Sequence, residues 1–391
     1  MTASQPPAFS ISVEPLGFAA PGEFYQGLRQ SLVSLDFLDE SRLLFTFRAP
    51  GLLHRTPGAE GGERQIRALV LSLPKGGTVD EALWTLHGTQ HYLWMLDGGH
   101  FLLRDGDQLR EGNADLDLKP LLQFPGPLLS VEMDPSRVYL VTNSHEPAGV
   151  EPKPGQVPSP ATAQAGVGEA AAAGGAQPDI VLRILRRATG QVMLVSRVRL
   201  PVRLPINHEG YVETLRGNGR EWLLNLNYFT GGSRILGRVT SLCEPPVEFL
   251  RLDEVLVNTC SPDGGRDLVA VTTEGQRLWD APSAPTQIWP LLVHAPDGSR
   301  VARETLTVNH AIGAYTPLSF DDVTGQQVEV LDSATGSLLL KAPASPVLDG
   351  GGNIAFSPSG QRVAVLNGGA IDVYDLPATP TAAAAPARSL Q

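Results

Sequence analysis

The sequence predicts an all-β fold made of many short strands. Its 391 residues include 41 glycines and 33 prolines, a high share of the residues that form turns. No segment sustains apolar residues at the spacings of three and four that an amphipathic helix requires. What remains is a series of short apolar runs between turns, and with 42% hydrophobic residues these runs can bury a large core.

The segment 354–377, IAFSPSGQRVAVLNGGAIDVYDLP, shows one repeating unit of these strands. Three apolar or alternating runs are separated by SPSG and NGG, which are turn sequences, so we expect three consecutive antiparallel strands. Residues 255–282 follow the same order, with SPDG after the first run, TEG after the second, and LWD in the third. We therefore interpret both segments as the first three strands of a unit.

Similar first turns occur along the whole chain and predict seven units, with six or eight as alternatives. A spacing of roughly 40 residues with four strands in each unit is typical of a propeller blade. The predicted first turns lie near Asp39, Asp97, Asp134, Asn218, Asp263, Asp297 and Ser359.

This pattern resembles the WD40-like and YVTN-type β-propeller repeats. The resemblance implies that the first strand of each unit lines a central channel. It also implies that the strands ending in LWD (278–280), VLD (330–332) and VYD (373–375) are third from the axis. The resemblance does not assign a function.

The last unit lacks a fourth strand, and the N-terminus can supply it. Only PATPTAAAAPARSLQ follows the third strand, and we expect residues 378–391 to be a disordered tail. Near the N-terminus FSISV places Phe9, Ile11 and Val13 on one face of a strand. We predict that residues 8–15 complete the last blade, so that residues 1–377 form a single closed propeller.

Three long connections interrupt the units, at 49–65, 147–178 and 309–325. The second is rich in Ala, Gly and Pro, and we expect it to be a disordered insertion. All three fall between the second and third strands of their blades, so they emerge on one face, where a rigid scaffold would present binding residues. The candidate binding residues there are His54, Arg55, His145, His310, Tyr315, Phe320, Asp321 and Asp322.

The sequence contains no motif for a catalytic site, a cofactor or a metal ion. His87 and His91 are four residues apart, but the glycine between them favours a turn over a metal-binding helix. We therefore predict a non-catalytic propeller that acts as a scaffold or as a binding module for a protein or a small ligand. The alternative is a propeller enzyme, such as a lyase, lactonase or glycan hydrolase, with a site at the channel mouth. Four residues near expected inner strands could serve it: Glu132, Glu213, His208 and His294.

Charge and composition bear on the partners and on the compartment. A formal net charge of −11 without a basic stripe argues against nucleic-acid binding, and no apolar run is long enough to span a membrane. We expect a monomer. Because no signal peptide is visible, we expect a cytoplasmic protein, or a periplasmic one if the true start lies upstream. The five tryptophans are expected in the core, and Cys243 and Cys260 are interpreted as small buried apolar residues.

Overall fold

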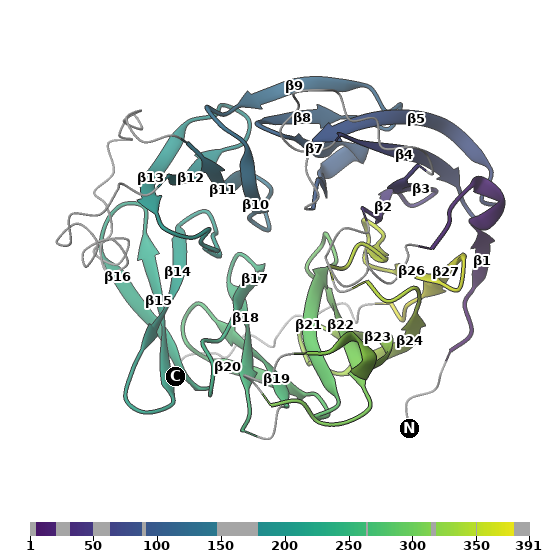
Figure 1. The fold of residues 1–391 in the computed structure, drawn as a ribbon. Helices are drawn as coiled ribbons and strands as arrows, with labels where there is room; N and C mark the ends of the chain where they lie inside the picture. Colours follow the sequence, from purple (N-terminus) through teal and green to yellow (C-terminus); the bar gives the residue numbers. More distant parts are fainter. Residues whose placement is uncertain are drawn as a thin grey trace, which may run out of the picture.

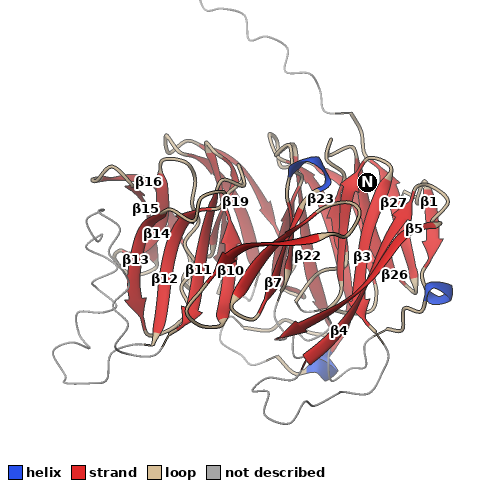
Figure 2. Cartoon of the chain, turned by 90° about the horizontal axis from the view of Figure 1, so that it is seen from above, coloured by secondary structure: helices blue, strands red, loops and turns tan. Residues whose placement is uncertain are grey.

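The computed structural model describes residues 5–20, 32–49, 63–87, 91–146, 179–262, 265–313, 318–348 and 350–378, without the side chains of residues 289, 290 and 320. In this part of the chain the strands form seven antiparallel sheets arranged in a ring (Figure 1). The protein is therefore a seven-bladed β-propeller, which confirms the predicted fold class and blade number. Seen edge-on, the strands run between the two rims of the ring (Figure 2).

The strands of each blade follow one another from the inner edge of the ring outward. Blade 1 contains β2 (Ser34–Asp39), β3 (Arg42–Arg48), β4 (Glu63–Ser72) and β5 (Thr78–His87). Blade 2 contains β6 (Leu93–Met95), β7 (Phe101–Asp105), β8 (Gln108–Gly112) and β9 (Leu118–Gln123), with η2 (Asp97–Gly99) in its first turn. Blade 3 contains β10 (Leu128–Met133), β11 (Tyr139–His145), β12 (Ile180–Arg186) and β13 (Val192–Val198).

The remaining blades follow the same order. Blade 4 contains β14 (Gly210–Arg216), β15 (Glu221–Tyr228) and β16 (Ser233–Thr240). Blade 5 contains β17 (Val247–Arg251), β18 (Glu254–Cys260), β19 (Arg266–Thr272) and β20 (Arg277–Pro282). Blade 6 contains β21 (Gln287–His294), β22 (Arg300–Val308), β23 (Val323–Asp332) and β24 (Leu338–Ala344), with η3 (Phe320–Asp322) before β23. Blade 7 contains β25 (Ile354–Phe356), β26 (Arg362–Asn367), β27 (Ala370–Asp375) and, from the other end of the chain, β1 (Phe9–Ser12), which η1 (Glu14–Leu16) follows.

Blade 4 departs from the predicted arrangement. Its innermost position is taken by a short segment that is joined to β14 through the isolated bridge between Ile206 and Tyr211. The first turn of this blade therefore lies at 207–210. The turn near Asn218, which we predicted to be the first, connects the second and third strands instead.

Blade 5 requires the same correction. The segment that begins at residue 255 belongs to β18, the second strand, because β17 pairs with it on the inner side. The turn near Asp263 therefore joins the second and third strands, and LWD lies on the outermost strand β20. VLD and VYD end the third strands β23 and β27, as predicted.

The N-terminal strand closes the ring. β1 pairs antiparallel with β27, with Phe9 opposite Val373 and Ile11 opposite Ile371 (Figure 1). Ile11 and Val13 are buried in a cluster that includes side chains of blades 1 and 7, and Phe9 packs against that cluster. The predicted closure by residues 8–15 is confirmed, because these residues complete the last sheet and the hydrophobic layer beneath it.

Each pair of adjacent blades encloses its own cluster of buried apolar side chains within the described part of the chain. Trp84 and Trp279 are buried in two of these clusters, and Trp94 packs partly buried against a third. Trp222 is also buried, so these four tryptophans are core residues as expected. The side chain of Trp289 lies outside the described part. Because each pair of adjacent blades encloses such a cluster, stability depends on contacts between neighbouring blades around the whole ring.

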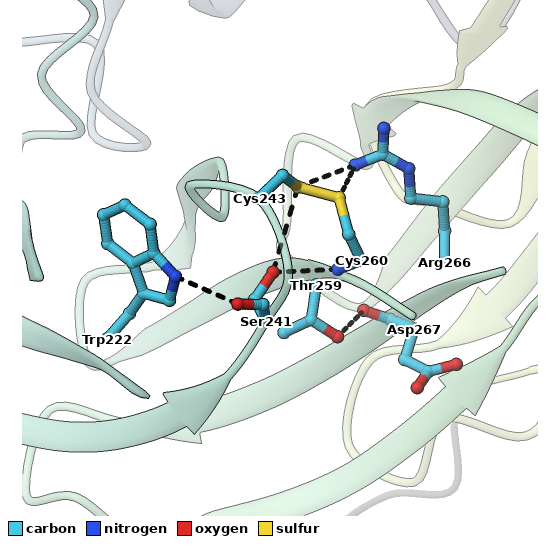
Figure 3. The surroundings of a disulfide bond; sticks show 7 residues. All are labelled: Trp222, Ser241, Cys243, Thr259, Cys260, Arg266 and Asp267. Carbon is cyan, nitrogen blue, oxygen red and sulfur yellow. Dashed lines mark hydrogen bonds between the residues drawn. A yellow bond between two sulfur atoms is a disulfide. The ribbon is translucent and has the colours of Figure 1, made fainter. Parts of the chain in front are cut away.

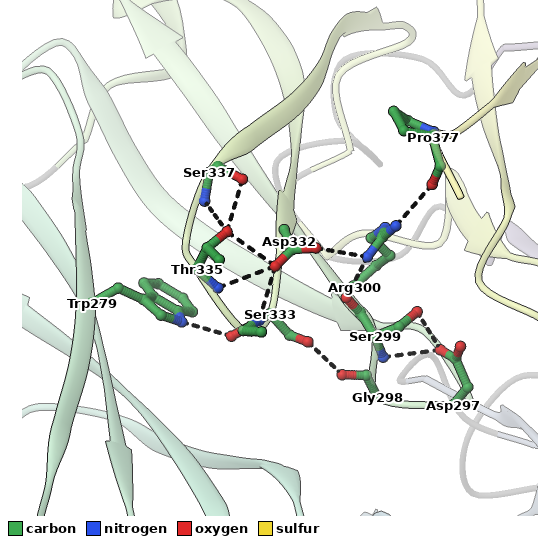
Figure 4. A network of polar contacts seen from close by, with 11 residues as sticks. Trp279, Asp297, Gly298, Ser299, Arg300, Asp332, Ser333, Thr335, Ser337 and Pro377 are labelled. Atoms are coloured by element: carbon green, nitrogen blue, oxygen red, sulfur yellow. Dashed lines mark hydrogen bonds and ion pairs between the residues drawn. The ribbon is translucent and has the colours of Figure 1, made fainter. Parts of the chain in front are cut away.

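Polar contacts reinforce the junctions between blades 5, 6 and 7 (Figure 4). The Trp279 indole on β20 donates a hydrogen bond to the Ser333 carbonyl of blade 6, over 2.6 Å. Arg300, only 1% exposed, pairs with Asp332 at 2.9 Å and also donates to the carbonyl of Pro377 at 2.8 Å. The buried guanidinium is thus compensated by one carboxylate, and it links blade 6 to the chain that leaves blade 7.

The cysteines differ from our expectation of two unlinked apolar residues. Cys243 and Cys260 form a disulfide with their Cα atoms 5.7 Å apart. Their separation of 17 residues did not reveal this pairing, because it depends on the connection after β16 folding back onto the end of β18. The expected disorder of 147–178 and of the tail concerns residues outside the described part, apart from Ala378.

Removing the closing strand should destabilise the whole ring. We predict that deletion of residues 1–15 causes a large loss of stability or aggregation, because two buried side chains worth about 1.5–3 kcal/mol each are lost and the edge of β27 is exposed. A finer test compares Val13→Asp, which places a carboxylate at a 0% exposed position directly after β1, with Ser12→Asp at the exposed last position of β1. Thermal unfolding followed by circular dichroism should show a marked decrease in melting temperature for Val13→Asp only. Equal melting temperatures for the two variants would contradict the closure.

Candidate functional site

The strand ends that the three long connections join lie on one rim of the propeller. These connections join β3 to β4, β11 to β12, and β22 to β23, which are the second and third strands of blades 1, 3 and 6. Because successive strands of a blade are antiparallel, the strand ends that these connections join share a rim with the links between blades. We call this the loop-rich rim, and the rim with the first-to-second strand turns the opposite rim.

An exposed histidine–carboxylate contact marks the base of the blade 3 insertion. His145 ends β11 and Asp179 directly precedes β12, and His145 Nε2 lies 2.6 Å from Asp179 Oδ2. Both side chains are about half exposed, at 50% and 54%. The backbone N–H of Glu146 donates to the carbonyl of Asp179 over 2.6 Å, so the base of the insertion is closed by main-chain and side-chain contacts.

A buried ion pair supports this exposed contact. Glu146 is fully buried, and Arg183 reaches its two carboxylate oxygens at 2.6 and 2.9 Å. Burial favours a raised pKa for Glu146, but hydrogen bonds from Arg183 and Ser144 outweigh it and lower the pKa. Glu146 therefore stays ionised and holds the two strand ends together beneath His145.

The blade 6 insertion has a comparable base. His310 Nδ1 lies 2.5 Å from Asn309 Oδ1 and 3.8 Å from Asp322 Oδ1, and the Asn309 N–H donates to the carbonyl of Asp322. Asp321 beside it is exposed. Ile312 is buried in a small apolar cluster of blade 6, so the loop is anchored at its start.

The predicted binding residues do not form a single site. His145 lies on blade 3, whereas His310, Asp321 and Asp322 lie on blade 6, with blades 4 and 5 between them. Phe320 belongs to η3, but its side chain lies outside the described part. His54, Arg55 and Tyr315 also lie outside the described residues.

A third histidine–carboxylate group on the loop-rich rim was missed. His87 ends β5, and its Nδ1 lies 2.8 Å from Asp105 Oδ1 while its Nε2 lies 3.8 Å from Glu63 Oε1. The Asp105 carboxylate also accepts a hydrogen bond from the His87 backbone N–H. The four-residue spacing of His87 and His91 does not indicate this group. Its actual partners come from the neighbouring strand, where Glu63 is opposite His87, and from the next blade.

Two of the four residues named for an enzyme site lie on inner strands and take part in one arrangement. Glu132 on β10 pairs with Arg203 at 3.1 Å, and His294 on β21 lies 3.4 Å from Glu248 on β17. Glu132 and Glu248 also interact electrostatically. We call these four residues, which come from blades 3 to 6, the inner-edge cluster.

The other two residues lie elsewhere. His208 is exposed in the first turn of blade 4, on the opposite rim, 3.9 Å from Glu209. Glu213 lies on β14 in the second-strand position and accepts a hydrogen bond from Asn227. The expectation that His208 and Glu213 lie near an inner strand is therefore wrong, because the first turn of blade 4 lies at 207–210 and β14 is its second strand.

The pKa of Glu132 favours proton exchange near neutrality. Enclosure within the ring raises the pKa to about 7, Arg203 opposes this rise, and Glu248 adds to it. About 30% of the Glu132 side chain still meets solvent, so the proton can exchange with water.

Among the described residues no group of three or more histidine, cysteine or acidic side chains is arranged to hold a metal ion. No helix in the same ranges is long and apolar enough to span a membrane.

A second unusual carboxyl lies deeper, at the junction of blades 6 and 7. Glu304 on β22 is 1% exposed, and burial raises its pKa to about 8, opposed by Asn353. In the described part of the chain neither carboxyl oxygen makes a well-aligned hydrogen bond. Glu304 is therefore protonated at neutral pH. Burial also raises the pKa of Asp36 on β2 to about 7, against the lowering effect of a hydrogen bond from Ser34.

Glu304 should make the protein less stable as the pH rises. The unfolded carboxyl ionises near pH 4.5 and the folded one near pH 8, so the folded state binds the extra proton between these values. The contribution of Glu304 to the free energy of unfolding is fully present below about pH 4.5. It decreases by about 1 kcal/mol per pH unit between that pH and about pH 8. We predict that Glu304→Gln unfolds with a flatter pH dependence in urea titrations from pH 5 to 8. The exposed Glu209→Gln serves as control, and a wild-type slope for Glu304→Gln would disprove this role.

Comparisons with known proteins found similar solved structures but no matching family. No protein-family model matches the sequence, and no curated protein matches it. Similar solved structures include the WD40 domain of Toxoplasma gondii coronin, with 9% identity and a TM-score of 0.48, covering 91% of this chain and 82% of that one. The WD40 β-propeller domain of Doa1 has 9% identity and a TM-score of 0.46, covering 95% and 97%. Sqt1 from Chaetomium thermophilum has 10% identity and a TM-score of 0.45, covering 88% and 96%. These WD40 propellers are similar to the chain at low identity, while its fold and its blade number rest on its own sheet topology.

Proposed function

We propose that this protein is a non-catalytic binding module that recognises a protein partner at its loop-rich rim. The observation that carries the proposal is the concentration on that rim of three partly exposed histidine–carboxylate groups, each with a member at or next to a strand end that a long connection joins. Binding residues commonly lie on connections that a rigid scaffold holds in place. Here the scaffold is a closed ring of seven blades.

The positions of these groups favour a protein over a small ligand. The bases of the insertions in blades 3 and 6 are separated by two blades in one direction and by three in the other. A ligand that contacts both must extend across the ring. A protein surface has that size, and specific interfaces usually bury about 800 Å² on each partner.

The exposed pairs have the chemistry for such a contact. His145 and Asp179 present a polar group held in place by the buried Arg183–Glu146 pair. On blade 6, His310 lies 3.8 Å from Asp322 at the base of the loop, and the exposed Asp321 directly precedes Asp322 in the chain. Pre-ordered polar groups lose little conformational freedom on binding, which favours recognition.

Histidine substitutions on the two rims test the proposal. We predict that His145→Ala combined with replacement of 311–319 by a Gly-Ser linker weakens partner binding at least tenfold, because both contact regions are altered. The matched control is His208→Ala, an equally exposed histidine on the opposite rim. Partners captured by the wild type would be identified by cross-linking mass spectrometry, and their affinity for each folded variant measured by biolayer interferometry. Equal binding by all variants, or cross-links confined to the opposite rim, would refute this assignment.

The inner-edge cluster favours a second candidate function, an enzyme that uses acid–base chemistry. Its carrying observation is Glu132, whose pKa of about 7 suits a general acid or base, close to Arg203 and in electrostatic contact with Glu248. On this hypothesis Glu132 would exchange a proton with substrate while Arg203 binds an anionic or carbonyl group.

A substrate screen separates the two functions. Purified protein would be assayed with lactones, aryl glycosides and uronic-acid polysaccharides. If the protein is an enzyme, Glu132→Gln should reduce kcat at least a hundredfold with an unchanged melting temperature. We expect no turnover that depends on Glu132; such turnover would replace the binding proposal with the enzyme.

A further inference from the structure

The disulfide lies on the loop-rich rim and joins two parts of the ring. Cys243 belongs to the connection between β16 and β17, which links blades 4 and 5, and Cys260 is the last residue of β18. The bond therefore fastens an inter-blade connection to the second strand of blade 5. Figure 3 shows this bond with Ser241 on one side and Arg266 on the other.

The two sulfur atoms differ in their surroundings. Cys260 is buried, at 4% exposure, whereas Cys243 is only half-buried. Thiol–disulfide exchange requires an incoming thiolate to approach one sulfur in line with the bond, so access decides which sulfur is attacked. Cys243 is the accessible one, and Cys260 is left as the departing sulfur.

A cation lies directly beside the departing sulfur. Arg266 Nη1 donates to Cys243 Sγ at 3.3 Å and approaches Cys260 Sγ more closely, at 2.5 Å. Within the described ranges no carboxylate pairs with this guanidinium, whose side chain is partly buried. A neighbouring positive charge stabilises a thiolate, and a stabilised thiolate leaves faster and makes the disulfide easier to reduce.

We propose that Cys243 and Cys260 form a reversible thiol–disulfide exchange site that accepts a dithiol reductant, with Cys243 as the attacked sulfur and Arg266 holding the thiolate of Cys260. This inference is independent of the proposed partner binding, because it concerns chemistry at the disulfide itself. Arg266 is a positioning and charge-stabilising residue in this exchange.

The exchange proceeds in two steps. The thiolate of the reductant attacks Cys243 Sγ, the bond between the protein sulfurs breaks, and its electron pair remains on Cys260 Sγ beside Arg266. The second thiolate of the reductant then attacks the reductant sulfur bound to Cys243. The reductant leaves as a disulfide, and Cys243 leaves as a thiolate that takes a proton from water. The protein gains two electrons, and the dithiol loses two.

Backbone contacts allow this exchange to occur in the folded protein. The Leu242 N–H donates to the Cys260 carbonyl at 3.0 Å, and the Cys260 N–H donates to Ser241 Oγ at 2.9 Å. The Trp222 indole holds the carbonyl of Ser241 at 3.1 Å. These hydrogen bonds do not involve the sulfur atoms, so the connection stays attached to blade 5 after reduction while the segment around Cys243 loses one restraint.

Redox titration tests the role of Arg266. The folded protein would be equilibrated with mixtures of reduced and oxidised dithiothreitol, and free thiols counted by mass spectrometry after alkylation. We expect Arg266→Gln to shift the equilibrium about tenfold toward the disulfide, which corresponds to ~30 mV. Arg266→Lys should keep an equilibrium constant close to that of the wild type, because lysine keeps the positive charge. The control Arg277→Gln, on the outer strand of the same blade, should leave the thiol–disulfide equilibrium unchanged.

Equal potentials for Arg266→Gln and the wild type would overturn the role of Arg266, as would a wild-type disulfide that dithiothreitol reduces only after denaturation. A second measurement needs no variant. Wild-type protein incubated with reduced glutathione would be digested and the mixed disulfide located. Glutathione on Cys243 is the expected result, and glutathione on Cys260 would overturn the assignment of the attacked sulfur.

Discussion

The pairing of β1 with β27 is the contact on which the rest of this structure depends. Each blade buries its two faces only against its neighbours, so the ring must close before every blade has two neighbours. The N-terminal strand supplies the outer edge of blade 7 and places Ile11 and Val13 in the layer between blades 7 and 1. The four residues of β1 and the Val13 that follows them thus complete a hydrophobic layer that would otherwise be open at one junction.

A closed ring gives different environments to similar side chains. Toward the inner edge and the blade junctions, Glu132 and Glu304 lose solvent and their pKa values move toward neutrality. On the loop-rich rim, His145 and His310 remain largely exposed and pair with carboxylates at the bases of insertions. The chemistry of each group follows from its radial position and from its rim, because these decide how much water reaches it.

Part of the fold and of the site could be predicted from local patterns. The alternation in FSISV identified the closing strand, and the positions of the three insertions identified the loop-rich rim. Blades 4 and 5 were misassigned because turn sequences such as SPDG occur between second and third strands as well as between first and second ones. The true first turn of blade 5, between Arg251 and Glu254, carries no glycine or proline.

By itself the sequence determined that the chain forms repeated four-stranded units and closes through its N-terminus, because strand alternation and turn residues act over a few neighbouring positions. Only the tertiary structure decided which side chains meet across blades. The Cys243–Cys260 bond, the contact of Arg266 with its sulfur atoms and the group around His87 join residues from separate strands or connections. Such contacts depend on the register and curvature of the whole ring, which a local sequence pattern does not determine.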